Sequence, residues 1–218
     1  SLEKCFLDEK FEEKPELKSI SMLNNEHLSV QLLMNETDLS LQTRRISKVK
    51  VVSALADCIT LRGVEQINVA MPAAKGWNDD NYLRKTPGLY PDLLTPLRYD
   101  GSAICAVGEL RCLWVDIRPS GQYPAGQYPV TIEMYNEQGE ELLATATLEV
   151  EIIGAALPAQ KLYYGQWFYV DTLAVYYHVE MFSERHWQII ENFIKAAVDG
   201  GINSILTPIL TPPLDTKV

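Results

Sequence analysis

The chain has 218 residues, 47% of them hydrophobic and 22% charged, a balance typical of a globular protein with a packed core. Lysine and arginine number 19 against 29 aspartates and glutamates, and the resulting net charge of −10 argues against nucleic acid and anionic membranes as partners, because both bind basic surfaces. A carbohydrate is compatible with this charge without being indicated by it, and no stretch stays apolar for long enough to span a bilayer.

The N-terminal residues carry no targeting signal that can be recognised. The start, Ser1 to Cys5, is polar and lacks the apolar stretch of a secretory signal peptide, so a cytoplasmic location is favoured. Ser1-Leu2 is interpreted as a cloning remnant, and the native N-terminus is therefore expected to differ.

Residues 28–153 are predicted to be rich in β-strands. Their apolar runs are short and are separated by glycine and proline. The alternation of Tyr128, Val130, Ile132 and Met134 is the period of a half-buried strand, and the turn at 136–139 joins this strand to the next in a hairpin. The predicted strands are 28–34, 46–54, 58–71, 110–117, 124–134 and 141–153. This pattern indicates a mainly β fold, an antiparallel β-sandwich of immunoglobulin or jelly-roll type over residues 1–156.

Residues 71–99 are predicted to be a long insertion without regular structure. The stretch mixes aromatic and acidic residues, including Trp77, Tyr82 and Tyr90. Loops of this length in a compact domain are functional or pack on a neighbour. Two interpretations stay open: docking against an adjacent domain, and binding of a sugar on aromatic side chains.

The pattern changes near Leu157, where a strand–helix–strand unit is predicted. The strands are placed at 162–168 and 202–210, and between them Ser183 caps a helix that carries Trp187 on its apolar face and ends at Gly200-Gly201. A crossover of this kind implies a parallel sheet, which needs more strands and covering helices than residues 157–218 supply. We therefore expect an incomplete domain whose exposed strands are disordered or associate with a second copy of the chain.

The cysteines and the known motifs indicate no cofactor and no metal. Cys5, Cys58, Cys105 and Cys112 form no C-x-x-C pair, and none of the three histidines lies close to them in sequence. They are predicted to be buried, reduced thiols. The nucleotide-binding, zinc-protease and serine-hydrolase motifs are also missing from the sequence.

Several runs resemble a known family. The segments 165–174, 182–187, 201–203 and 207–216 resemble the start of the catalytic barrel in bacterial proteins similar to glycoside hydrolase family 123, the β-N-acetylgalactosaminidase-like group. Segments 87–94 and 126–128 resemble the sandwich of the same proteins. The resemblance implies that an N-terminal β-sandwich precedes a (β/α)₈ barrel, of which residues 157–218 form the first β-α-β unit.

The resemblance also implies a reaction. Family members are expected to remove terminal N-acetylhexosamine with retention, using the acetamido oxygen of the substrate as nucleophile and an Asp–Glu pair to orient it and to donate a proton. The only adjacent Asp–Glu pair here, Asp8-Glu9, lies near the N-terminus, and none follows Leu157. We therefore assign no catalytic residue. The parent protein is predicted to be a glycoside hydrolase and this fragment to be inactive; the alternative is a carbohydrate-binding or structural sandwich that supports a barrel.

Candidate sugar contacts follow from the rule that barrel active sites lie at the carboxyl ends of strands. In the functional interpretation, Trp167 stacks on the sugar, and Asp171 and Asp215 accept hydrogen bonds from hydroxyl groups. In the structural interpretation, Trp167 is core, Asp171 caps a turn, and the Thr-Pro pairs stiffen a loop. His178 is placed in the loop that follows the first strand, on the same rim. The six candidates are Trp167, Asp171, His178, Thr207, Thr211 and Asp215.

Overall fold

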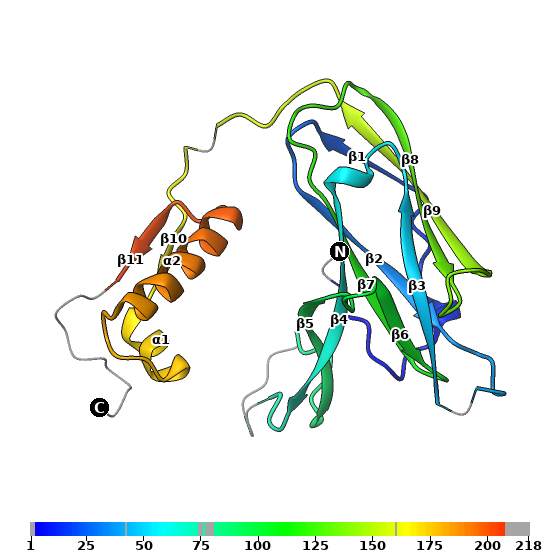
Figure 1. Cartoon of the computed structure of the whole chain (residues 1–218), viewed down its shortest axis with the longest axis horizontal. Helices are drawn as coiled ribbons and strands as arrows, with labels where there is room; N and C mark the ends of the chain where they lie inside the picture. The colour runs from blue at the N-terminus through cyan, green and yellow to red at the C-terminus, as the bar shows by residue number, and fades with distance from the viewer. Residues whose placement is uncertain (1–2, 42, 74–75, 77–80, 160, 208–218) are drawn as a thin grey trace. The chain divides into compact units, whose positions relative to one another are not determined.

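The computed structural model describes residues 3–41, 43–73, 76, 81–159 and 161–207. The chain divides into two compact units, Ser1–Leu157 and Pro158–Val218, whose elements are labelled in Figure 1. Each unit is described by itself below.

The first unit is a sandwich of two sheets (Figure 1). One sheet has the order β1-β9-β8-β3-β6, with strands Ser19–Leu23, Leu142–Ile153, Gly126–Tyr135, Arg44–Val52 and Ser102–Ala106. The other has the order β2-β7-β4-β5, with strands Leu28–Asn35, Leu110–Ile117, Ile59–Val69 and Gly88–Pro96. Short 3-10 helices span Phe11–Glu13 (η1) and Ala56–Cys58 (η2). The mainly β fold class predicted from the sequence is confirmed.

The hairpin of β8 and β9 forms as the alternating pattern predicts. Met134 lies opposite Ala144 and Val130 opposite Leu148. The turn is closed by Asn136, whose backbone and side-chain oxygens accept hydrogen bonds from the next residues, including a 2.9 Å bond from the amide of Gly139. Gly139 has φ 80°, a left-handed conformation that favours glycine.

The core of the first unit lies between the two sheets. Val130, Val150 and Ile152 point inward from β8 and β9 and are at most 2% exposed. Val115 and Ile117 of β7 join the same cluster from the other sheet. Because side chains alternate along a strand, Cys112, Trp114 and Asp116 lie on the opposite, outer face of β7.

Three strands were not predicted from the sequence, namely β1, β5 and β6. β5 lies inside the stretch predicted to be an irregular insertion. It contains Pro91, and its register against β4 shifts between Glu65 and Gln66, so the strand shows no regular alternation. β1 pairs in parallel with β9, which departs from a wholly antiparallel sandwich.

An N-terminal segment covers part of the outer face of the β2-β7-β4-β5 sheet. Cys5 and Phe6 are 6% and 4% exposed. The ring of Phe6 meets Tyr90 edge-on at 5.4 Å, and the guanidinium carbon of Arg84 lies 3.8 Å from its centroid. The backbone oxygen of Leu7 accepts a 2.9 Å hydrogen bond from the amide of Leu110, which ties the segment to β7.

The second unit has the order β10-α1-α2-β11, with elements Gly165–Trp167, Val170–Tyr177, Glu184–Asp199 and Ser204–Leu206. β10 and β11 pair in parallel, as predicted, but both strands are shorter than predicted. Helix α1 was missed. Its β-branched and aromatic residues, such as Val175 and Tyr176, are typical of strands, and only the tertiary context selects a helix.

Helix α2 begins as the sequence predicts. The hydroxyl oxygen of Ser183 accepts a 3.3 Å hydrogen bond from the amide of His186, and Gly201 at φ 88° follows the helix. Ile189 and Ile190 pack against Leu173 of α1. Trp187, which the sequence places on the apolar face of this helix, is 52% exposed and lies against Phe182 with ring centroids 5.6 Å apart.

Candidate functional site

The carboxyl edge of the β10–β11 pair brings two predicted residues together. Trp167 lies opposite Leu206, and the amide of Phe168 donates a 2.9 Å hydrogen bond to the oxygen of Leu206. Thr207 follows Leu206 directly. Trp167 and Thr207 therefore share the edge at which a parallel α/β protein builds its site.

Trp167 forms an aromatic pair at this edge. Its indole is 65% exposed and stacks on the ring of Tyr169, with centroids 5.9 Å apart and planes 12° apart. Tyr169 is the residue that precedes helix α1 and was not among the sequence candidates. In the described part of the chain Trp167 is mostly exposed, and this does not fit the alternative interpretation of Trp167 as a core residue.

Asp171 lies in the first turn of helix α1, and not at a strand end as the sequence predicts. The difference arises because α1 begins at Val170, directly after the short strand β10. The position still suits a carboxylate, since the amino end of a helix favours negative charge. Asp171 is half-buried and four residues beyond Trp167.

Thr207 has a buried hydroxyl without a hydrogen-bond partner in the described part of the chain. Its Oγ1 is inaccessible to solvent and makes no hydrogen bond with the described residues. Buried hydroxyl groups in folded proteins are nearly always hydrogen-bonded. A partner for Thr207 is therefore expected among residues outside the described ranges or in a ligand.

His178 ends helix α1 and lies away from this edge. It adopts φ 53° and ψ 47°, and its amide donates to the carbonyl oxygens of Ala174 and Val175. It lies seven positions beyond Asp171, which corresponds to a helical rise of about 10 Å. The structure thus explains His178 as a helix cap on an exposed surface. Thr211 and Asp215 lie outside the described residues.

His186 was missed as a positioning residue. It is fully buried, its Nδ1 accepts a 2.9 Å hydrogen bond from the amide of Phe182, and its Nε2 donates a 2.8 Å bond to the oxygen of Val170. These partners fix the neutral tautomer that carries its proton on Nε2. His186 therefore holds the start of helix α1, next to Asp171. No sequence motif marks this role, because the contact joins two helices.

Asn203 fastens the opposite, amino edge of the strand pair. Its side-chain amide donates to the oxygen of Leu162 at 2.8 Å, and its side-chain oxygen accepts from the amide of Tyr164 at 2.8 Å. Both bonds are made to residues just before β10. Asn203 thus sets the register that brings Trp167 opposite Leu206.

A polar cluster on the outer face of the β2-β7-β4-β5 sheet surrounds Asp116. The carboxylate is 3% exposed and accepts hydrogen bonds from Ser29 at 2.5 Å, from Trp114 Nε1 at 2.9 Å and from Arg62. Burial alone would raise the pKa of Asp116, but these donors outweigh it and hold the pKa below its ordinary value. The carboxylate is fully satisfied, which marks the cluster as structural.

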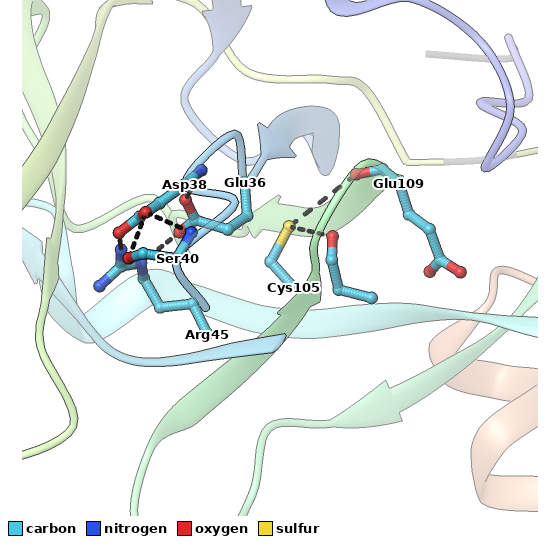
Figure 2. A network of polar contacts seen from close by, with 7 residues as sticks. Glu36, Asp38, Ser40, Arg45, Cys105 and Glu109 are labelled. Atoms are coloured by element: carbon cyan, nitrogen blue, oxygen red, sulfur yellow. Dashed lines mark hydrogen bonds and ion pairs between the residues drawn. The ribbon is translucent and has the colours of Figure 1, made fainter. Parts of the chain in front are cut away.

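A hollow of about 1380 Å³ lies between β2 and the β8–β9 hairpin, with walls that include Val30, Val130 and Leu148. Glu36 and Arg45, which also line it, bind each other (Figure 2). Burial would raise the pKa of Glu36, but the hydrogen bond from Arg45 holds it below its ordinary value. Apolar side chains form most of its walls, and several polar side chains, among them Gln31 and Thr147, also line it.

The network in Figure 2 secures the turn after β2. Arg45 also binds Asp38 at 3.2 Å, and the hydroxyl of Ser40 donates to Asp38 at 2.6 Å. The thiol of Cys105 is directed at the carbonyl oxygens of Ala106 and Glu109, 3.8 and 4.0 Å away.

Over the described ranges, no group of three histidine, cysteine, aspartate or glutamate side chains could hold a metal ion. In the same ranges, none of the helices has the length and hydrophobicity of a transmembrane span.

Residues 167–217 match the catalytic domain of glycoside hydrolase 123. Over this stretch the chain is similar to glycoside hydrolase family 123. All six candidate residues fall within the matched stretch. The structure also resembles a family 123 glycoside hydrolase from Clostridium perfringens, solved in a study of glycolipid glycan hydrolysis, with a TM-score of 0.69 and 15% identity over 93% of this chain. The chain spans 36% of the length of that protein.

Two further solved structures match with a TM-score of 0.31 and 12% identity each. They are the N-terminal domain of PorA, matched over 66% of this chain and 92% of that domain, and a PapD-like domain of human CEP192, matched over 69% and 94%. No curated protein matches the chain. The resemblance to family 123 glycoside hydrolases stated from the sequence is confirmed by the catalytic-domain match and by the shared fold.

Proposed function

We propose that the chain is part of a glycoside hydrolase that removes N-acetylhexosamine-type residues from glycans, glycolipid glycans among them. The observation that carries the proposal is the match of residues 167–217 to the family 123 catalytic domain. That stretch begins at Trp167, the residue at the carboxyl edge of the parallel strand pair. The parallel pair and its helices correspond in this proposal to the first β-α-β unit of a (β/α)₈ barrel.

The described residues would form one wall of the sugar site. The stacked rings of Trp167 and Tyr169 present an exposed aromatic face, which suits the apolar CH face of a sugar. Asp171 would bind sugar hydroxyl groups, and Thr207, whose hydroxyl is buried, would belong to the wall at the end of β11. Thr211 and Asp215 belong to the same proposed wall, while the position of His178 gives it a structural role.

The reaction would use the acetamido oxygen of the substrate as nucleophile, with an adjacent Asp–Glu pair to orient it and to protonate the leaving oxygen. No adjacent Asp–Glu pair follows Leu157 in the sequence. We therefore propose that residues 1–218 alone do not hydrolyse glycans, and that this chain contributes binding and support.

Substitutions at the aromatic edge test the proposal in the full-length protein. With 4-nitrophenyl β-N-acetylgalactosaminide as substrate, Asp171→Asn is expected to lower kcat/KM roughly tenfold to hundredfold, because a hydrogen bond to a charged group is lost. Trp167→Ala is expected to raise KM by about threefold to tenfold through the loss of stacking. Steady-state kinetics measure both effects.

Two variants serve as matched controls. Tyr176→Ala changes an aromatic residue on α1 that is 75% exposed, and Asp57→Asn changes an aspartate of η2 in the first unit. Both are expected to leave kcat/KM within about twofold. Equal losses in the control and test variants would refute the proposed site, and absence of turnover on β-N-acetylhexosaminides by the full-length wild type would refute the proposed reaction.

For the sandwich we propose structural support of the barrel in preference to sugar binding. Tyr90, an aromatic candidate of the predicted insertion, is already engaged: its ring packs on Phe6, and its hydroxyl is directed at the carbonyl oxygens of Arg84 and Thr86. Trp77 lies outside the described residues. Tyr82, which is also described, is 37% exposed, and the ammonium of Lys85 lies 5.5 Å from its ring centroid.

The outer edges of β10 and β11 have no strand partner in the described part of the chain. Unpaired strand edges are commonly covered in folded proteins. In our proposal the further strands of a barrel cover these edges, and self-association through the same edges is the alternative.

A further inference from the structure

The segment from Glu3 to Leu7 runs across the outer face of β7 in the opposite direction to the strand. At one end, the oxygen of Leu7 accepts a 2.9 Å hydrogen bond from the amide of Leu110. At the other end, the backbone oxygen of Glu3 accepts a 2.6 Å hydrogen bond from Nε2 of Gln31. Gln31 lies opposite Trp114 of β7.

These two ties place Cys5 over Cys112. Cys5 is midway between Glu3 and Leu7, and Cys112 is midway between Leu110 and Trp114. Alternation along β7 directs Cys112 to the outer face, the face that the segment covers. The two thiols therefore approach each other from opposite layers, although they are 107 positions apart in the sequence (112 − 5).

The surroundings of the two sulfur atoms support this placement. Cys5 and Cys112 are 6% and 5% exposed. The thiol of Cys112 donates to Gln31 Oε1 at 3.1 Å, so one glutamine side chain contacts both the segment and the cysteine of β7. Burial, together with the neighbouring Cys5, raises the pKa of Cys112 to about 12.

We propose that Cys5 and Cys112 form a disulfide when a small-molecule disulfide such as glutathione disulfide is present, which locks the N-terminal segment onto the sheet. One cysteine thiolate attacks glutathione disulfide, forms a mixed disulfide and releases one glutathione thiolate. The second cysteine thiolate then attacks the mixed disulfide at the protein sulfur and releases the second glutathione. The two protein thiols lose two protons and two electrons, and glutathione disulfide gains them.

The same burial makes the reaction slow at neutral pH. The thiolate is the attacking species, and a raised pKa keeps both groups in the thiol form. The rate is therefore expected to increase as the pH rises from 7 to 9. The product closes a loop of more than a hundred residues, and is expected to raise the thermal midpoint of the first unit by about 5 °C or more.

Oxidation of the wild-type chain is the deciding experiment. The protein is incubated with glutathione disulfide at pH 8.5, quenched with acid and digested, and its peptides are identified by mass spectrometry without reduction. A linked peptide that joins Cys5 to Cys112 is expected, with a matching rise in the thermal midpoint. The double variant Cys58→Ser, Cys105→Ser is expected to give the same linkage.

Two results would overturn the proposal. One is recovery of Cys5 and Cys112 as separate glutathione adducts or as free thiols under these conditions. The other is linkage of either residue to Cys58 or Cys105 in comparable yield. The variant Cys5→Ser should lose both the linked peptide and the rise in midpoint, and a short bis-alkylating reagent on the wild type provides an independent check that the two thiols are neighbours.

Discussion

Replacement of Asp116 by alanine is expected to lower the free energy of unfolding of the first unit by about 3–5 kcal/mol. The carboxylate is buried on β7. The side chains of Ser29, Trp114 and Arg62 donate to it, and His27 Nε2 lies 3.4 Å from it. Removal of the acceptor leaves the guanidinium of Arg62 without its buried counter-charge and the indole N–H of Trp114 without an acceptor. Urea unfolding, followed by circular dichroism of the β-sheet signal, measures the change.

The variant Asp92→Ala is the matched control. Asp92 forms an ion pair with Lys4 at 2.8 Å, but the two side chains are 59% and 43% exposed. Exposed pairs of this kind contribute about 1 kcal/mol or less. If Asp92→Ala destabilised the unit as much as Asp116→Ala, the buried network would have no special role.

The Asp116 network also predicts how stability depends on pH. Its folded-state pKa lies below the ordinary aspartate value of about 4, so its stabilisation is complete above that value and is lost as the pH falls through the lowered folded value. The difference in unfolding free energy between wild type and Asp116→Ala is therefore expected to be constant from pH 8 to 5 and to shrink below about pH 4. A difference that grew in acid would contradict this assignment.

Replacement of His186 by alanine is expected to weaken the packing of α1 on α2 by about 2–4 kcal/mol. The change leaves the amide of Phe182 and the carbonyl of Val170 without their buried partner, and each such group costs about 1–3 kcal/mol. It also opens a cavity at a fully buried position. Hydrogen exchange of peptides that cover residues 170–199 measures the loss of local stability.

His178→Ala provides a control with the same change of side chain. His178 is exposed, and its amide, not its imidazole, makes the bonds that cap α1. Substitution there is expected to change local stability by about 0.5 kcal/mol or less. Equal exchange rates in the His186→Ala variant and the wild type would show that the imidazole does not hold the start of α1.

Much of the sandwich could be predicted because its signals are local. The strand Leu110–Ile117 has the predicted bounds, and the β8–β9 hairpin follows from alternation and from a turn with glycine. β5 was missed because Pro91 and a register shift interrupt its period. β1 was missed because it has five residues and gains its partner, β9, from the far end of the unit.

In the candidate site, too, the features with local sequence signals could be predicted and those that depend on long-range packing could not. Trp167 and Thr207 could be placed at one edge because a parallel strand pair follows from a strand–helix–strand pattern. Helix α1 could not be predicted, since residues with strand propensity form it under the packing of Leu173 against Ile189 and Ile190. Its presence moves Asp171 into a helix turn and carries His178 to the far end.

By itself, the sequence determined the β-rich half, the change of pattern near Leu157, the cap at Ser183 and the resemblance to family 123 glycoside hydrolases. Each of these depends on residues within one turn, one strand or one motif. Only the tertiary structure decided the roles of His186 and Asp116, because each has at least one partner 16 or more residues away in sequence, such as Val170 for His186. Hydrogen bonds over such separations leave no period in the sequence, so folding alone brings their partners together.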